Sequence, residues 1–275
     1  MKHRIANIRH VALDMDGTIY RGGTLFDVTL PFLNLLRELG IGYTFLTNNP
    51  SKSVRDYLDH LSQLGIQAAQ DQIYTSTQAT IEFLQEQPVK RIFALGTPSM
   101  WAEFTSAGFT LAADDPHDEP DAVVVGFDTT LTYARLCRAA WWISQGKPFV
   151  ATNPDRVCPT DQPTVLVDCG SICSCLQTAT GRAPDRVLGK PDPAMIRGIL
   201  HRHSLSAQQL AMVGDRLYTD MEMARRAGAL GVLVLTGETT ESAAREWSPE
   251  PDWIVVKDLA EFGARLKAAR LEAVS

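Results

Sequence analysis

Short apolar runs alternate with amphipathic segments along this chain, and that alternation limits the folds it can adopt. Residues 11–13 predict a buried strand, followed by a loop and a helix near 30–39 that Gly40 is placed to end. Residues 43–46 predict the next strand, and a helix with apolar residues at helical spacing covers 54–64. This β-loop-α order predicts a parallel sheet wrapped by helices. The residues expected near one face of the first helix are Leu30, Leu33, Leu36 and Leu39.

A second α/β series begins near Val89, and the first pattern resumes at Asp192-Pro193, which is a cap and first-turn signal for a helix. The polar signals at strand ends stop and restart around the same places. We therefore expect an inserted domain at 81–184 between two core segments, 1–80 and 185–275. The second series predicts strands at 91–95, 122–125, 149–151 and 165–167 and helices around 101–107 and 133–144; later strands are expected at 210–213, 231–235 and 253–256.

Composition and charge narrow the class of protein. The chain has 275 residues, of which 45% are hydrophobic and 21% charged, as in ordinary globular proteins. No apolar run approaches the roughly 20 residues of a membrane span, and the N-terminus has no secretory apolar core, so we expect a cytoplasmic protein without a membrane partner. Net charge is −6 and basic residues are thinly spread, which argues against nucleic acid as a partner. A small phosphorylated metabolite remains compatible.

Five cysteines is an odd number in a chain too large to need disulfides, so reduced thiols are expected. Cys169, Cys173 and Cys175 lie close together, but they lack paired Cys-x-x-Cys spacing and a nearby histidine. Packing of these cysteines inside the insert is therefore favoured over a structural zinc site.

The sharpest polar feature is Asp14-Met15-Asp16-Gly17-Thr18, which directly follows a predicted buried strand. In isolation this segment could be an ordinary turn, since aspartate bonds the local backbone and glycine permits positive φ. Ligands, however, bind at the carboxyl ends of strands in open parallel sheets. Two carboxylates at this spacing could share one pocket, where one attacks while the other handles protons.

Three further segments follow predicted strands or precede predicted helices. Thr47-Asn48-Asn49 offers a hydroxyl and backbone N–H groups, and Gly189-Lys190-Pro191 offers a compact positive charge. Val213-Gly214-Asp215 and Thr219-Asp220 add two carboxylates. Taken singly, these residues could be helix caps, a solvated lysine or an Asx turn. Their occurrence together at several strand ends predicts a site for Mg²⁺ and phosphate.

This ordered set resembles motifs one to four of the haloacid dehalogenase superfamily. The extended forms at 11–20, 46–51 and 212–220 resemble its subclass IIA, with the NagD-like and nitrophenylphosphatase-like phosphatases. Thr152–Asp155 and Ala179–Pro184 match patterns of the same branch. The resemblance covers nearly the whole chain. It implies an α/β fold, in which a Rossmann-like, doubly wound parallel-sheet core carries an inserted α/β cap domain.

The resemblance also implies catalytic and metal-binding roles. Asp14 would be the nucleophile, which forms an aspartyl-phosphate and ligates Mg²⁺. Asp16 would protonate the leaving alcohol and then activate water, with its carbonyl oxygen on the metal. Asp215 would be the second carboxylate ligand, and Asp220 would orient Lys190 or a metal-bound water.

For the substrate, the resemblance implies that Thr47 and Lys190 hold the phosphoryl oxygens together with the Asn48 amide. It also implies a homodimer through the cap. Independently, Trp141-Trp142 is expected to be cap core or a dimer face and not a substrate platform. The stretch from Asp168 departs from the Pro-Gly-x-Gly-like loop of the branch, so no particular substrate can be carried over. The residues of the cap that could contact substrate are Asn153, Asp155 and Asp168.

The expected function is Mg²⁺-dependent hydrolysis of a small phosphate monoester, of the sugar phosphate, nucleoside monophosphate, phosphoglycolate or pyridoxal phosphate type. A phosphotransferase or mutase would use the same chemistry with a different acceptor. A hydrolytic dehalogenase would need neither Asp16 nor Mg²⁺. A phosphate-binding protein without catalysis is disfavoured, because every expected catalytic side chain is present.

Overall fold

The computed structural model describes residues 2–158, 160, 162–247 and 253–274, and the chain forms two units. We call them the core unit and the cap unit. The core unit comprises Met1–Leu46, Leu58–Tyr74 and Pro191–Ser275, and the cap unit comprises Thr47–Tyr57 and Thr75–Lys190. The insert expected at 81–184 falls within the second segment of the cap unit.

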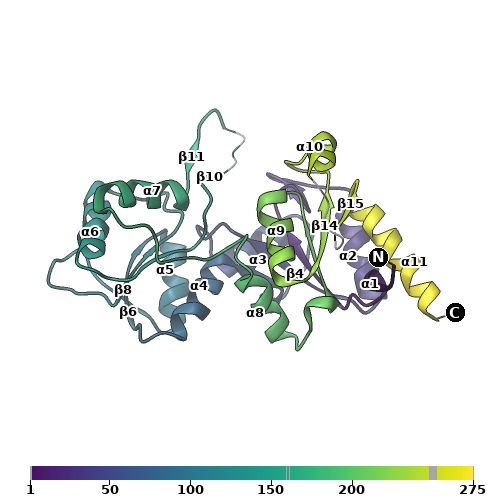
Figure 1. The fold of residues 1–275 in the computed structure, drawn as a ribbon, viewed down its shortest axis with the longest axis horizontal. Helices are drawn as coiled ribbons and strands as arrows, with labels where there is room; N and C mark the ends of the chain where they lie inside the picture. The colour runs from purple at the N-terminus through teal and green to yellow at the C-terminus, as the bar shows by residue number, and fades with distance from the viewer. Residues whose placement is uncertain (1, 159, 161, 248–252, 275) are drawn as a thin grey trace. The chain divides into compact units, whose positions relative to one another are not determined.

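A six-stranded sheet forms the centre of the core unit, in the order β15-β14-β13-β1-β4-β5, and the neighbouring pairs from β15 to β4 are parallel. Figure 1 labels β4, β14 and β15 of this sheet. The central strands are buried along their whole length, which is why they appear in the sequence as continuous apolar runs. The strand order reverses between β1 and β13. The predicted doubly wound α/β fold is therefore confirmed. The strands are β1 (His10–Asp14), β4 (Gly42–Thr47), β5 (Ile73–Thr75), β13 (Leu210–Gly214), β14 (Leu230–Val234) and β15 (Trp253–Val256).

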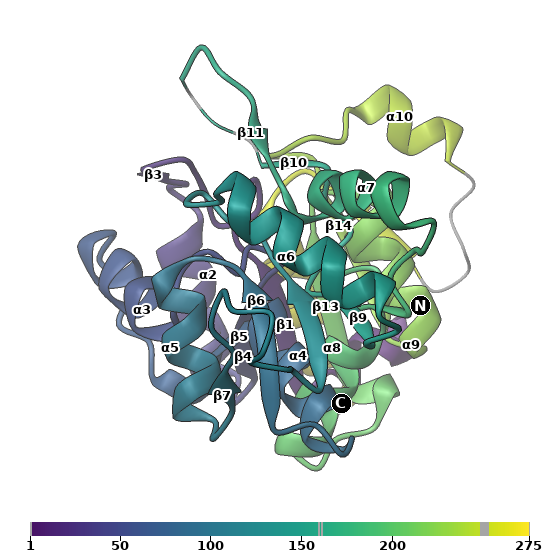
Figure 2. The ribbon, with the colours of Figure 1, turned by 90° about the vertical axis from the view of Figure 1, so that its left-hand side faces the viewer.

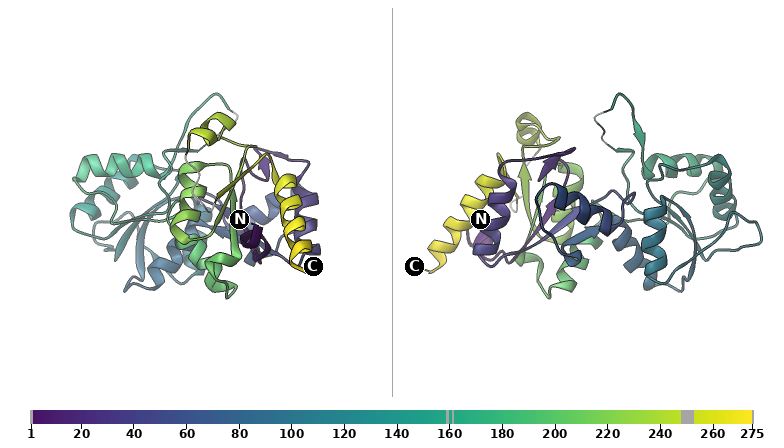
Figure 3. Two further views of the ribbon diagram at one scale, coloured as in Figure 1. Left: turned by 45° about the vertical axis from the view of Figure 1, so that its right-hand side comes forward. Right: turned by 180° about the vertical axis from the view of Figure 1, so that it is seen from behind.

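Helices cover this sheet; α1 and α2 both pack on α11, and α8 packs against α9. Figure 3 shows α11 in yellow beside the N-terminal α1 in purple. Gly40 ends α2 in the left-handed conformation with φ 64°, as predicted. The predicted apolar face of α2 was wrong at Leu30, which is 39% exposed, because Phe32 fills the core there. The helices are α1 (Lys2–Ala6), α2 (Thr29–Glu38), α3 (Val54–Gln63), α8 (Ala194–Arg202), α9 (Glu222–Ala227), α10 (Glu241–Glu246) and α11 (Leu259–Val274).

The cap unit has its own five-stranded parallel sheet, ordered β12-β9-β8-β6-β7. Alternate residues of β6, β8 and β9 pack against α6 and α7, which lie side by side in Figure 2. Trp142, Cys169 and Cys173 belong to this apolar cluster, as expected, whereas Cys175 is exposed, so its expected packing was wrong. The elements are α4 (Ser76–Gln85), β6 (Arg91–Leu95), α5 (Pro98–Ser106), β7 (Thr110–Leu111), β8 (Ala122–Val125), α6 (Tyr133–Ser144), β9 (Phe149–Ala151), α7 (Cys169–Thr180) and β12 (Arg186–Val187).

Two small antiparallel hairpins complete the strands of the described residues: β2 (Tyr20–Arg21) with β3 (Thr24–Leu25), and β10 (Val157–Cys158) with β11 (Leu166–Val167). The strand predicted at 165–167 therefore lies in a hairpin and not in the cap sheet. Likewise Asp168 caps α7 and the following residues form its first turn. No helix in the described part of the chain is both long and apolar enough to cross a membrane.

His10 is an ionisable group built into the core sheet at the start of β1. Its side chain is 4% exposed, its Nε2 lies 2.9 Å from the Thr44 hydroxyl, and its ring centroid lies 4.3 Å from that of His203. Burial, and secondarily the neighbouring His203, lowers the pKa of His10 to about 3. The native core thus holds this imidazole neutral.

We expect the stability of the core unit to fall with acidification between about pH 6.5 and pH 3, because the unfolded chain then takes up a proton at His10 that the native protein excludes. This residue contributes a slope of about 1.4 kcal/mol per pH unit in that window. His10→Gln should remove that part of the slope in denaturant unfolding at pH 4 to 7. The exposed His201→Gln serves as the control. Equal slopes in His10→Gln and the wild type would contradict the assignment.

Candidate active site

Two polar segments meet where the strand order of the core sheet reverses. Asp14 is the last residue of β1, and Asp215 directly follows β13, the parallel neighbour of β1. The strand order reverses between these two strands, and open α/β sheets bind ligands at the carboxyl ends of strands at such a reversal. The sheet itself therefore brings together side chains that are about 200 residues apart in the sequence.

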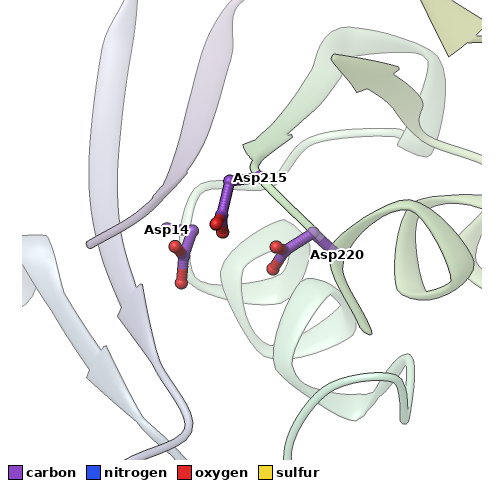
Figure 4. Close-up of side chains that lie close together, drawn as sticks. All are labelled: Asp14, Asp215 and Asp220. Carbon is purple, nitrogen blue, oxygen red and sulfur yellow. The ribbon is translucent and has the colours of Figure 1, made fainter. Parts of the chain in front are cut away.

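Asp14, Asp215 and Asp220 form a cluster of three carboxylates (Figure 4), in which one oxygen of each lies within 4.8 Å of the others. Their exposed fractions are 9%, 2% and 0%, respectively. The Thr18 hydroxyl donates to Oδ2 of Asp14 at 3.2 Å. Asp220 lies in the π-helical turn Leu217–Met221, where a Cβ on residue 214 would approach its Cγ to 2.3 Å. Glycine before Asp215 is thus what lets Asp220 join the cluster.

Electrostatics in this cluster favour a bound cation. Burial, followed by the charges of Asp14 and Asp220, raises the pKa of Asp215 to about 7. Oδ1 of Asp215 is buried, and within the described part of the chain it has no hydrogen-bond partner. An unsatisfied carboxylate oxygen among like charges is costly unless a positive group balances it. Oxygen-only donors of this kind suit Mg²⁺, so the residues fit the predicted metal.

Asp16 stands two residues beyond Asp14 in a tight turn. The Gly17 N–H donates to the Tyr20 carbonyl at 2.7 Å, and Gly17 adopts a φ of 86°, which explains the glycine. Burial and then the charge of Asp14 raise the pKa of Asp16, against the opposing charges of Arg216 and Arg21. The turn therefore places a second, chemically distinct carboxyl group next to the predicted nucleophile.

The predicted phosphate-binding residues Thr47, Asn48 and Lys190 are buried members of the cap unit. Thr47 ends β4 one residue after Leu46, the register partner of Asp14. Oδ1 of Asn48 accepts the Lys190 N–H at 2.6 Å, and its Nδ2 donates to the Lys190 carbonyl at 3.0 Å. The side-chain amide of Asn48 is therefore engaged in fixing the backbone that carries Lys190.

The cap candidates Asn153, Asp155 and Asp168 extend the same network. Nδ2 of Asn153 donates to the Asn48 carbonyl at 3.0 Å, and Nδ2 of Asn48 donates to the Asp155 carboxylate at 3.1 Å. Asp168 caps α7 through the Cys169 N–H, while burial and then the charge of Asp155 raise its pKa to about 7. These residues contact one another and the loop around Asn48, and Asn153 is fully buried.

One polar segment of the core was missed by the sequence reasoning. Thr236–Thr239 follows β14, the next strand after β13 in the sheet, and its Glu238 N–H contacts Asp215. The signal was available, because this segment also lies just beyond the carboxyl end of a buried strand. It was passed over because a Thr-Gly-Glu-Thr sequence has no characteristic spacing of its own.

Comparison with known proteins assigns this geometry to a family. A model of haloacid dehalogenase-like hydrolases matches residues 11–110, and a second HAD-hydrolase-like model matches 187–262. The ribonucleotide monophosphatase NagD of Escherichia coli K12 is 30% identical over 247 residues, which cover 90% of this chain and 95% of NagD.

Solved structures agree. The 4-nitrophenylphosphatase of Thermotoga maritima superposes with a TM-score of 0.89 at 38% identity, covering 95% of this chain and 98% of that one. A glycerol phosphate phosphatase of Mycobacterium tuberculosis in complex with magnesium superposes with a TM-score of 0.87 at 32% identity, covering 96% and 79%. The chain therefore belongs to the haloacid dehalogenase-like hydrolases, in the NagD-like subclass IIA, and is a phosphoric monoester hydrolase.

Proposed function

We propose that the protein hydrolyses a small-molecule phosphate monoester with the help of Mg²⁺, through an aspartyl-phosphate on Asp14. The observation that carries the proposal is the buried cluster of Asp14, Asp215 and Asp220, with its unsatisfied oxygen on Asp215. Asp14, Asp215 and the carbonyl oxygen of Asp16 would hold the ion. When bound, Mg²⁺ would neutralise charge on the cluster and on the phosphate. The magnesium complex of the Mycobacterium tuberculosis relative supports the choice of ion.

In the first step an oxygen of Asp14 attacks phosphorus, and the bond between phosphorus and the ester oxygen breaks. Asp16 gives its proton to that oxygen, so the alcohol leaves neutral. In the second step the Asp16 carboxylate takes a proton from water, which attacks phosphorus of the aspartyl-phosphate. Inorganic phosphate leaves and the Asp14 carboxylate is restored. The tight turn that holds Asp16 two residues after Asp14 supports this pairing of roles.

We further propose that Thr47 and Lys190 bind the phosphoryl oxygens. Phosphoryl transfer depends mainly on positioning and charge neutralisation, so a hydroxyl and an ammonium group held on fixed backbone are well suited to it. The paired hydrogen bonds from Asn48 to the Lys190 backbone support such fixation. Asn48 would thus contribute chiefly through Lys190, and Asp220 would assist Lys190 or a metal-bound water.

The substrate class is a small phosphorylated metabolite. Relatives are named for ribonucleotide monophosphates, nitrophenyl phosphate and glycerol phosphate. These names support a small phosphate monoester as the substrate, but they do not select one compound. A phosphotransferase or mutase would transfer the phosphoryl group to an organic acceptor, whereas the proposed enzyme transfers it to water and releases inorganic phosphate. We propose a cytoplasmic location, where the five free cysteines would stay reduced.

Phosphate release from a panel of monoesters tests the proposal directly. We expect inorganic phosphate from one or more of sugar phosphates, nucleoside monophosphates, phosphoglycolate, pyridoxal phosphate and nitrophenyl phosphate with Mg²⁺, and none with a chelator. Asp14→Asn should abolish release, because an amide is a poor nucleophile, while Asp59→Asn on the exposed face of α3 should behave as wild type. Undiminished hydrolysis by Asp14→Asn would refute the nucleophile assignment.

Thermal unfolding should report the metal independently of turnover. Repulsion within the carboxylate cluster destabilises the metal-free core, so Mg²⁺ should raise Tm, and Asp215→Asn should raise Tm without metal and reduce the gain from Mg²⁺. About 2–4 °C is expected for each kcal/mol of repulsion removed. Scanning calorimetry with and without Mg²⁺ measures both effects, with Asp59→Asn as the control. A wild-type Tm that is the same with and without Mg²⁺ would refute the metal site.

We also propose that the cap unit associates with a second copy of this chain through one face of α6. Tyr133, Cys137 and Trp141, four residues apart, form an exposed stripe there; Tyr133 is 81% and Trp141 49% exposed. The neighbouring α7 carries no charged residue, and Arg138 of α6 is paired with Asp114 at 3.0 Å. A chain of net charge −6 can pair such an uncharged face with itself without like-charge repulsion.

Light scattering during size-exclusion chromatography should therefore find a dimer that Trp141→Glu converts to a monomer, because the variant buries two like charges at the interface. Ala102→Glu, on the exposed part of α5, is the matched control and should remain dimeric. A monomeric wild type, or a Trp141→Glu variant that stays dimeric, would contradict this face as the interface.

A further inference from the structure

The segment Thr236–Thr239, which we call the Asp215 loop, contacts the side chain and the backbone of Asp215. The Glu238 N–H donates to Oδ2 of Asp215 at 2.6 Å, and the Thr239 N–H donates to the Asp215 carbonyl at 3.2 Å. These two backbone donors fix both the carboxylate and the main chain of one residue. The loop thus contacts the cluster through backbone atoms, which its side chains alone do not indicate.

Gly17 and Gly237 approach Oδ2 of Asp215 closely. A Cβ on residue 237 would lie 1.9 Å from Oδ2 of Asp215, and a Cβ on Gly17 would lie 2.5 Å from it. Both distances are shorter than any real contact, so only glycine allows the loop and the turn after Asp14 to approach this closely. Oδ2 is therefore enclosed and hydrogen-bonded, whereas the buried Oδ1 has no partner within the described residues.

Both ends of the Asp215 loop are tied to the core unit by side chains. At one end, the Thr236 hydroxyl donates to the Gly17 carbonyl at 2.6 Å, and Arg21 Nη2 donates to the Thr236 carbonyl at 2.6 Å. At the other end, the Glu238 carboxylate accepts from the Tyr218 hydroxyl at 2.7 Å and pairs with Arg216 Nε at 2.9 Å. The loop is anchored to the two turns that carry Asp14 and Asp215.

We propose that the Asp215 loop orients the Asp215 carboxylate, so that Oδ2 is held by the protein and Oδ1 is presented to Mg²⁺; Gly237 and Glu238 are positioning residues. This inference rests on the proposed metal site and adds the device that selects the ligating oxygen. A carboxylate with both oxygens free would sample several rotamers, and binding would then require ordering it. The loop removes that cost before the ion arrives.

The test compares Gly237→Ala with Gly23→Ala, a matched glycine in the β2–β3 hairpin whose Cβ would meet nothing within 4 Å. Mg²⁺ affinity is measured by calorimetric titration and by the Mg²⁺ dependence of Tm, without substrate. We expect Gly237→Ala to bind Mg²⁺ about tenfold or more weakly, as is usual when support of a metal ligand is lost. Gly23→Ala should match the wild type.

Changes at Glu238 keep the proposal testable if Gly237→Ala does not fold. Glu238→Ala retains the N–H donor but loses the ties to Arg216 and Tyr218, so about two- to fivefold weaker binding is expected, the usual effect of a partly exposed contact. Glu238→Gln keeps one acceptor oxygen, which can serve Arg216 Nε or the Tyr218 hydroxyl, and should restore part of the affinity. A merely structural loop would lower Tm equally with and without Mg²⁺ and leave the affinity unchanged.

The outcomes separate the two proposals. If the wild type binds no Mg²⁺, the proposed metal site fails, and the positioning role fails with it. If the wild type binds Mg²⁺ and the folded Gly237→Ala and Glu238→Ala variants bind it equally well, only the positioning role is overturned. Weaker binding in these variants, with Gly23→Ala unaffected, supports both.

Discussion

Repulsion among Asp14, Asp215 and Asp220 is the constraint on which the rest of the core depends. Two like charges 4 Å apart cost about 4 kcal/mol at the effective dielectric near a protein surface, and these three carboxylates are buried. The chain stabilises them with hydrogen-bond donors from the same turns, such as the Thr18 hydroxyl and the Arg216 N–H. Glycines at the closest approaches let the backbone reach them. Without a cation such a cluster lowers the stability of the fold, so its presence favours the interpretation as a cation site.

The parallel sheet explains why this cluster could be predicted from sequence. Each contributing segment follows a buried apolar strand, and the carboxyl ends of parallel strands share one edge. Strand β1 and the run before Asp215 are fully buried, so their apolar sequences indicated their type and, to within one residue, their ends. The same reasoning predicted β6, β8 and β9 with their bounds. Local patterns suffice where burial is complete along an element.

Prediction from the sequence failed where contacts with other parts of the chain, and not the local pattern, determine the structure. Residues 166–167 are as apolar as a sheet strand, but they pair with Val157–Cys158 in a hairpin. Leu30 fits the helical period of α2, yet Phe32 takes the buried position. The contacts of Asn48 with Lys190 join side chain and backbone 142 residues apart, and no spacing rule encodes such a pair. The place of the Asp215 loop after a strand end was visible in the sequence, but its contact with Asp215 is made by its backbone and not by a recognisable side chain.

The residues proposed for phosphate belong to the cap unit, and the carboxylates proposed for the metal belong to the core unit. Thr47 opens the first segment of the cap unit and Lys190 closes the second, so both residues assigned to phosphate stand where the chain passes between the units. The side chain of Asn48 ties these two junctions together within the cap unit, and Asn153 adds a bond to the same loop. The carboxylate cluster, by contrast, is held entirely by core elements. In this arrangement the proposed metal site depends on the core sheet, whereas the residues that we propose for phosphate depend on the packing of the cap. From the proposed roles we therefore expect a change in the cap network to alter substrate binding without disturbing the metal ligands.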